Sequence, residues 1–133
     1  MHQQILERSQ QHILTAFPQV IAIYVFGSFD TQYETTDSDV DLAVLANEPL
    51  DQVELWRLAQ DIAIDIRRNV EIIDLKEAST VFRFQVITTG KRFYCSDPKK
   101  CDATENVYLS MYLRFNEERS EIIKDKWGIP ASS

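Results

Sequence analysis

Short apolar runs rich in β-branched and aromatic residues recur along the chain. The first two runs, Val20–Phe26 and Val40–Ala46, each contain almost no polar residues, which is typical of strands buried on both faces of a sheet. We expect these two strands to lie side by side. A third run, Val70–Asp74, predicts a third strand, and residues 92–95 predict a short edge strand.

Other stretches carry apolar residues at three- and four-residue spacing, which predicts helices. Pro18 stops the first helix, Pro49 suits the first turn of the second, and Gly90 closes the third. Asp97 is a plausible cap for the last helix, and Gly128 ends it. The predicted helices cover residues 3–17, 49–68, 79–89 and 97–126.

This order of elements predicts an α/β (α+β) fold, in which a small mixed β-sheet is flanked by helices and a long helix stands at the C-terminal end. The 133 residues are enough for one domain with a substantial core, so we expect a single domain over residues 1–133.

Composition narrows the possible partners. No apolar run approaches the roughly 20 residues that a bilayer span needs, and residues 1–8 lack the order of a signal peptide, so we expect a cytoplasmic protein without a membrane partner. The net charge of −7 opposes attraction to nucleic acid, and we expect no direct nucleic-acid contact. Cys95 and Cys101 are the only cysteines, and we expect reduced thiols because no further ligand completes a zinc pattern.

A Gly27-Ser28 pair ends the first predicted strand, and after ten residues Asp39-Val40-Asp41 opens the second. Residues two apart in a strand face the same side, so Asp39 and Asp41 present two carboxylates together if the strand begins by Asp39. Such a pair favours a divalent cation, and magnesium prefers carboxylate and phosphate oxygens. Gly27 allows a phosphate to approach the backbone, and the Ser28 hydroxyl can donate to it. The motif therefore predicts a site for a metal and a nucleotide triphosphate.

A third carboxylate would complete a two-metal site. The third predicted strand offers Glu71 and Asp74, which lie an odd number of residues apart and so face opposite sides of the sheet. Periodicity does not choose between them.

Other interpretations of the motif are weaker. The chain has only three glycines, which excludes a Rossmann fingerprint and a P-loop. Asp37 to Asp41 match the opening of an EF-hand loop, but position six of that loop needs glycine and is Leu42 here. The two aspartates could also be a solvated turn, and Gly27-Ser28 a tight bend with a cap. This interpretation does not explain the spacing between the two motifs or the apolar runs beside them.

Gly27, Ser28, Asp39 and Asp41 resemble the signature of the DNA polymerase β-like nucleotidyltransferase superfamily. The short length and the ten-residue spacer are similar to the minimal nucleotidyltransferases, specifically the MntA antitoxins that pair with HEPN-domain RNase toxins of the HepT type. The resemblance implies the nucleotidyltransferase palm fold, with a catalytic part at about residues 20–95 and a helical segment at about 97–127. It also favours Glu71 over Asp74 as the third carboxylate, although aspartate is usual at that position.

The resemblance further implies roles for these residues. Asp39, Asp41 and Glu71 would bind magnesium, with two ions in the complete site, and Gly27 and Ser28 would contact the phosphates of ATP. The third carboxylate would also help to deprotonate the acceptor hydroxyl. Arg67, Arg68, Arg83 and Lys91 are candidates for neutralising the triphosphate, and the sequence does not choose among them.

Larger relatives append a domain that holds the acceptor, and this chain has no room for one. The resemblance therefore implies that the acceptor is a tyrosine of a cognate HEPN toxin, which would be adenylylated and silenced within a hetero-oligomer. Two alternatives stay open: transfer to a small molecule such as an aminoglycoside, and a non-catalytic antitoxin that acts by binding the toxin.

Overall fold

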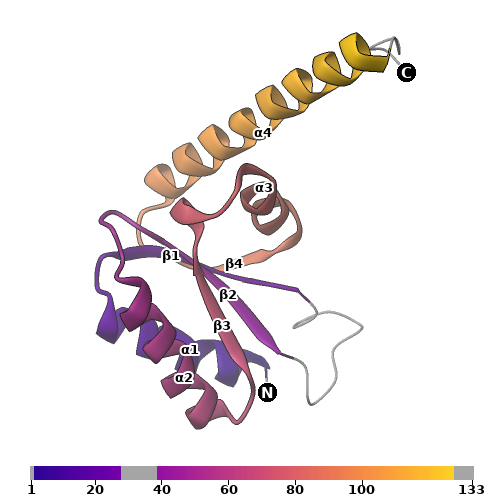
Figure 1. Cartoon of the computed structure of the whole chain (residues 1–133). Coiled ribbons are helices and arrows are strands. Elements are labelled where there is room, and N and C mark those ends of the chain that lie inside the picture. Colours follow the sequence, from indigo (N-terminus) through magenta and orange to yellow (C-terminus); the bar gives the residue numbers. More distant parts are fainter. Residues whose placement is uncertain (1, 28–38, 128–133) are drawn as a thin grey trace.

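A computed structural model of the chain describes residues 2–27 and 39–127, and the side chains of residues 3–27 and 39–117. The elements follow in the predicted order (Figure 1). They are α1 (His2–Ala16), β1 (Val20–Phe26), β2 (Val40–Ala46), α2 (Gln52–Ile66), β3 (Val70–Asp74), the 3₁₀ turn η1 (Leu75–Glu77), α3 (Thr80–Thr89), β4 (Lys91–Cys95) and α4 (Pro98–Trp127).

The four strands form one mixed sheet in the order β3-β2-β1-β4. β1 pairs antiparallel with β2 and with β4, whereas β2 pairs parallel with β3 after the crossover through α2. The expectation that the first two strands lie side by side is confirmed. So is the predicted fold class, a small mixed sheet flanked by helices.

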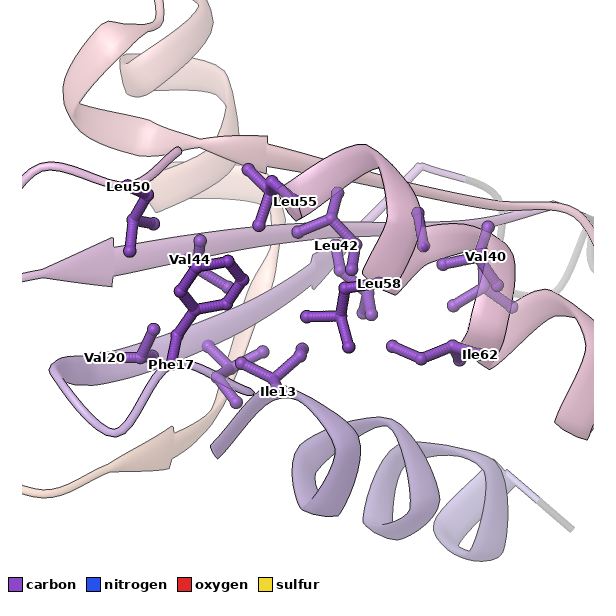
Figure 2. Close-up of a cluster of buried hydrophobic side chains, with 14 of the residues drawn as sticks. Ile13, Phe17, Val20, Val40, Leu42, Val44, Leu50, Leu55, Leu58 and Ile62 are labelled. Atoms are coloured by element: carbon purple, nitrogen blue, oxygen red, sulfur yellow. The ribbon is translucent and has the colours of Figure 1, made fainter. Parts of the chain in front are cut away.

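One face of the sheet is covered by α1 and α2, as Figure 1 shows. The side chains between these two helices and the sheet form the larger hydrophobic cluster (Figure 2). In it, Ile13 of α1, Leu42 of β2 and Ile62 of α2 have no exposed surface. Fully burying each of these side chains contributes about 1.5–3 kcal/mol. This cluster fixes α2, and with it the turn that leads into β3.

The opposite face is covered by η1, α3 and the first turns of α4. Its cluster includes Tyr24, Ala43, Leu75 and Val86, all almost completely buried. β1 and β2 are therefore packed on both sides, which explains why their sequences are continuous apolar runs instead of alternating ones.

Helix α4 is anchored to this second face by polar contacts. The Tyr24 hydroxyl donates to Glu105 at 2.7 Å, and the Arg92 guanidinium donates to the same carboxylate at 2.7 Å and to Asp102 at 3.0 Å. Tyr112 stacks on Phe84 of α3 with ring centroids 3.8 Å apart. Beyond these contacts, α4 extends as a single helix away from the sheet (Figure 1).

The bounds of the helices and of β4 differ from the prediction by one to three residues, and one turn was not predicted. The second helix begins at Gln52 and not at Pro49, because the Asp51 side chain accepts the backbone N–H groups of Val53 and Glu54 and so caps the helix there. The turn η1 was not predicted, since three residues are too few to show a period. Asp97 caps α4 as expected by accepting from the Lys100 N–H at 3.2 Å, and the predicted stop at Gly128 lies outside the described residues.

Both cysteines are free, as expected, although their sulfur atoms lie 3.2 Å apart. None of the helices in the described ranges is long and apolar enough to cross a membrane.

Candidate active site

Three strand ends meet at one end of the sheet. Asp41 is paired in register with Phe26 at the end of β1 and with Glu71 near the start of β3. Ala43 lies two residues after Asp41, and Ile73 lies two residues after Glu71. Both side chains belong to the hydrophobic cluster on the α3 side of the sheet. Their carboxylates therefore lie next to each other on that face of the sheet.

Asp39 lies just before β2 and is oriented by the turn between α2 and β3. The Val40 N–H donates to the Asn69 carbonyl at 2.9 Å, and the Asn69 side-chain amide donates to Asp39 Oδ1 at 3.4 Å. The turn is made by Arg67, which caps α2 in the left-handed region with φ of 59°. Asn69 was not predicted as a site residue, and its position directly before a predicted strand was the only sequence signal available.

The electrostatics link the three carboxylates. Burial raises the pKa of Asp41 above its ordinary value, and the nearby charges of Glu71 and Asp39 raise that pKa further. Three acidic groups within one another's field are unfavourable when all are ionised. A bound cation would remove this repulsion.

Gly27 makes room for the Asp41 carboxylate. Its φ is +79°, a conformation that glycine adopts without strain. A Cβ atom built on Gly27 would lie 2.4 Å from Asp41 Oδ2, which is far inside van der Waals contact. The positive φ therefore favours glycine here, and a Cβ atom would displace the Asp41 carboxylate. Ser28, the other predicted nucleotide contact, lies outside the described residues.

Asp74 stands at the other end of β3. It is only 6% exposed, and it accepts the Lys76 N–H at 3.1 Å, so that it caps the turn η1. Burial raises its pKa, against the effect of this hydrogen bond. The parallel register of β3 with β2 thus places Glu71, and not Asp74, beside Asp41.

The candidate cations differ in their surroundings. The guanidinium of Arg83 donates to the carbonyls of Leu75 and Lys76 and lies 4.3 Å from the centre of the Tyr108 ring, so it serves the packing of α3. Arg67 and Arg68 border, with Asn69, a cavity of about 370 Å³. Lys91 begins β4 beside Val25. Of the four candidates, Arg67 and Arg68 lie nearest in sequence to Asn69, the residue whose side chain contacts Asp39.

The donor set suits magnesium. Within the described ranges, no three acidic, histidine or cysteine side chains form a ready cage around one ion. Magnesium is commonly held by one or two carboxylates and completes its shell with water and substrate phosphates. The all-oxygen pair of Asp41 and Glu71, with Asp39 adjacent, fits an ion that arrives with a nucleotide.

Comparison with known proteins identifies the family of the chain. The family model for polymerase beta nucleotidyltransferases matches residues 9–99. The protein adenylyltransferase MntA of Shewanella oneidensis is 38% identical over 109 residues, which cover 81% of this chain and 77% of that protein.

Solved structures of toxin–antitoxin complexes are also similar. A complex of tri-AMPylated Shewanella oneidensis HEPN toxin with MNT antitoxin matches with a TM-score of 0.80 and 34% identity, covering 94% of this chain and 98% of that chain. A toxin–antitoxin complex with AMP-PNP matches with a TM-score of 0.80 and 34% identity, covering 90% and 95% of the two chains. The chain therefore belongs to the polymerase β nucleotidyltransferase family and, within it, to the MntA group.

Proposed function

We propose that this chain is an antitoxin that transfers AMP from ATP to a tyrosine hydroxyl of a cognate HEPN-domain toxin and thereby silences it. The proposal rests chiefly on the position of Gly27, Asp41 and Glu71 at one end of the sheet, in a chain that is 38% identical to a protein adenylyltransferase. The similar MNT antitoxin occurs with a tri-AMPylated HEPN toxin, which supports a protein acceptor over a small molecule.

In the proposed site, Asp39, Asp41 and Glu71 hold magnesium, and Gly27 and Ser28 hold the phosphates of ATP. Bound magnesium would neutralise the phosphate charge and stabilise the pyrophosphate as it leaves. The chain's own residues bring the nucleotide and the acceptor together, so that the hydroxyl oxygen attacks the α-phosphorus in line and the bond to pyrophosphate breaks. Glu71 takes the proton of the hydroxyl in this arrangement.

The proposed organisation is one domain over residues 1–133, with the catalytic part at about 20–95 and the helical segment at about 97–127. The acceptor then arrives on a second protein, and the two chains form a hetero-oligomer. The packing of α4 on α3 through Tyr112 and Phe84 supports a single unit.

The test is to incubate the chain with the product of its neighbouring gene, tested as the HEPN partner, together with magnesium and α-labelled ATP. We expect label on the HEPN protein, no label with Asp39→Asn/Asp41→Asn, and normal labelling with Glu54→Gln. Glu54 is a suitable control because it is an exposed carboxylate on α2 that pairs only with Arg57, at 3.2 Å, in the described structure.

Each other outcome identifies a different function. Label transfer that survives the double substitution would contradict the catalytic assignment. Loss of RNase activity in a stoichiometric mixture without any label would indicate an antitoxin that acts by binding. Label on a small molecule alone would indicate the aminoglycoside-type alternative.

A further inference from the structure

A cleft of about 420 Å³ opens beside Glu71, outside the group of residues assigned to the nucleotide. One wall is the edge strand β3, and the other is formed by η1 and the first turn of α3. Its lining residues are Gln52, Glu71, Ile72, Ile73, Asp74, Glu77, Ala78, Ser79 and Phe82.

The order of the strands separates this cleft from the nucleotide side. β2, which carries Asp41, lies between β1 and β3. Gly27 follows β1 and contacts Asp41 from that side, whereas the cleft lies on the β3 side and includes Glu71. A group that enters the cleft would therefore meet the carboxylates from the side opposite to Gly27.

The lining of the cleft is acidic and partly aromatic. Glu71 and Glu77 contribute exposed carboxylates, whereas the carboxylate of Asp74 is buried and caps η1. No lysine or arginine is among the lining residues. The nearby Arg83 has its guanidinium bound to the carbonyls of Leu75 and Lys76. Phe82 adds an aromatic ring, held edge-on against Phe26 with centroids 5.4 Å apart.

The wall formed by β3 has a further property. β3 is the last strand of the sheet, so its outer edge pairs with no other strand in the described part of the chain. Backbone groups at such an edge are available to an extended segment of another protein. The cleft thus combines a negative lining, an aromatic ring and an open strand edge next to Glu71.

We propose that this cleft seats the acceptor segment of the partner: a positively charged stretch of protein whose aromatic hydroxyl reaches Glu71 from the β3 side. The inference rests on the proposed function, because it assumes a protein acceptor. It assigns Glu77 to partner recognition, since this side chain lines the cleft but lies on η1, away from Asp39 and Asp41.

The experiment measures binding of the neighbouring-gene product, the same partner as in the labelling test, without ATP, at low and at moderate salt. We expect Glu77→Lys to weaken binding about tenfold at low salt and to reduce its salt dependence, with a smaller effect from Glu77→Gln. The affinity for AMP-PNP with magnesium should stay within about twofold, because rim charges act mainly on the partner they face. Glu54→Lys, the same charge reversal on α2, should leave both affinities unchanged.

Partner binding by Glu77→Lys that equals that of the unaltered chain at both salt concentrations would overturn the proposal. So would an equal loss with Glu54→Lys, since that would indicate a general effect of net charge. The two hypotheses fail separately. Binding that depends on Glu77 in the absence of any label transfer would contradict the proposed function and keep the cleft as a docking site, whereas label transfer with binding that ignores Glu77 would do the reverse.

Discussion

At the scale of single residues, Asp41 is held between strand β1 and strand β3. Gly27 leaves room for its carboxylate on one side, and Glu71 stands beside it on the other. The raised pKa of Asp41 records the energetic disadvantage of ionising this carboxylate in the folded chain. Such a group of carboxylates is expected to destabilise the folded chain when no cation is bound.

Replacing Asp41 by asparagine should stabilise the metal-free protein at neutral pH. The pKa of Asp41 is higher in the folded chain than in the unfolded one, so ionisation lowers stability as pH rises from the unfolded value through the folded one. At pH 7 in EDTA, we expect the melting temperature of Asp41→Asn to be roughly 2–5 °C higher. At about pH 3, below the ordinary pKa of 3.8, residue 41 is mostly uncharged in both proteins, so the gain in melting temperature should disappear. A gain of the same size at both pH values would contradict this explanation.

Replacing Gly27 by alanine should lower both stability and activity. The left-handed backbone costs a residue with a Cβ atom about 1–2 kcal/mol, and this atom would also displace the Asp41 carboxylate. A shift of about 1 Å in a reacting site lowers kcat by about 100-fold, so we expect that loss in AMP transfer. Urea unfolding and labelling assays measure the two effects.

Gly90→Ala serves as the control, because its Cβ would meet the carbonyl oxygen of Val86 at 2.5 Å and not Asp41. This variant should lose stability, yet its affinity for magnesium and AMP-PNP should match that of the unaltered chain. Normal metal affinity in Gly27→Ala would show that the glycine serves the turn alone.

At the scale of elements, α4 is attached to the sheet by a compact polar network. Glu105 accepts from Tyr24 and from Arg92. Burial and the contact with Glu105 raise the pKa of Tyr24, so its hydroxyl stays protonated and keeps donating at any ordinary pH. Cys101, Tyr108 and Tyr112 of α4 add apolar contacts with the second face and with α3, whereas Val107, Met111 and Leu113 are exposed.

Glu105→Ala should therefore loosen α4 more than any other element. It leaves the Tyr24 hydroxyl without its acceptor and removes one of the two carboxylates that Arg92 contacts, and we expect a loss of about 2–3 kcal/mol in the free energy of unfolding. Hydrogen exchange should accelerate in residues 98–108 and stay unchanged in α1. Asn106→Ala, an exposed neighbour on the same helix, should change neither. Uniform acceleration over the whole chain would contradict a local role.

At the scale of the whole molecule, two hydrophobic clusters share one sheet. β2 contributes Leu42 and Val44 to the cluster under α1 and α2, and Ala43 and Leu45 to the cluster under α3. Because the same strand belongs to both clusters, neither layer can open without disturbing the other. We expect the described residues to unfold in a single transition.

Leu42→Ala tests this coupling. Leu42 has no exposed surface, and its truncation should cost about 2–5 kcal/mol. If the two layers unfold together, the denaturant midpoint from backbone circular dichroism should equal the midpoint from hydrogen exchange in α3. Both midpoints should be lower than in the unaltered chain, although α3 lies on the other face of the sheet. Separate midpoints for α2 and α3 would contradict the shared-sheet explanation.

Much of the arrangement is determined by local sequence. The apolar runs of β1, β2 and β3 have the same bounds in the structure as in the sequence, because burial on both faces leaves an uninterrupted hydrophobic pattern. The spacing of Asp39 and Asp41 is also a local feature of the sequence, but Asp39 lies just before β2 and is oriented by its contact with Asn69. The resemblance to the family rests on the same short motif, and the family model over residues 9–99 confirms it.

Other features depended on which segments become neighbours. Periodicity shows that Glu71 and Asp74 face opposite sides, but only the parallel register of β3 with β2 brings Glu71 beside Asp41 and leaves Asp74 to cap η1. The contact of Asn69 with Asp39 likewise arises between segments distant in the chain, whereas the cleft along β3 is formed mainly by residues 71–82, which are close in sequence. The sequence by itself determined the elements and the carboxylate pair, because these depend on local periodicity. The tertiary structure decided which carboxylate of β3 lies beside Asp41, because pairing across strands is not encoded in the period of any one strand.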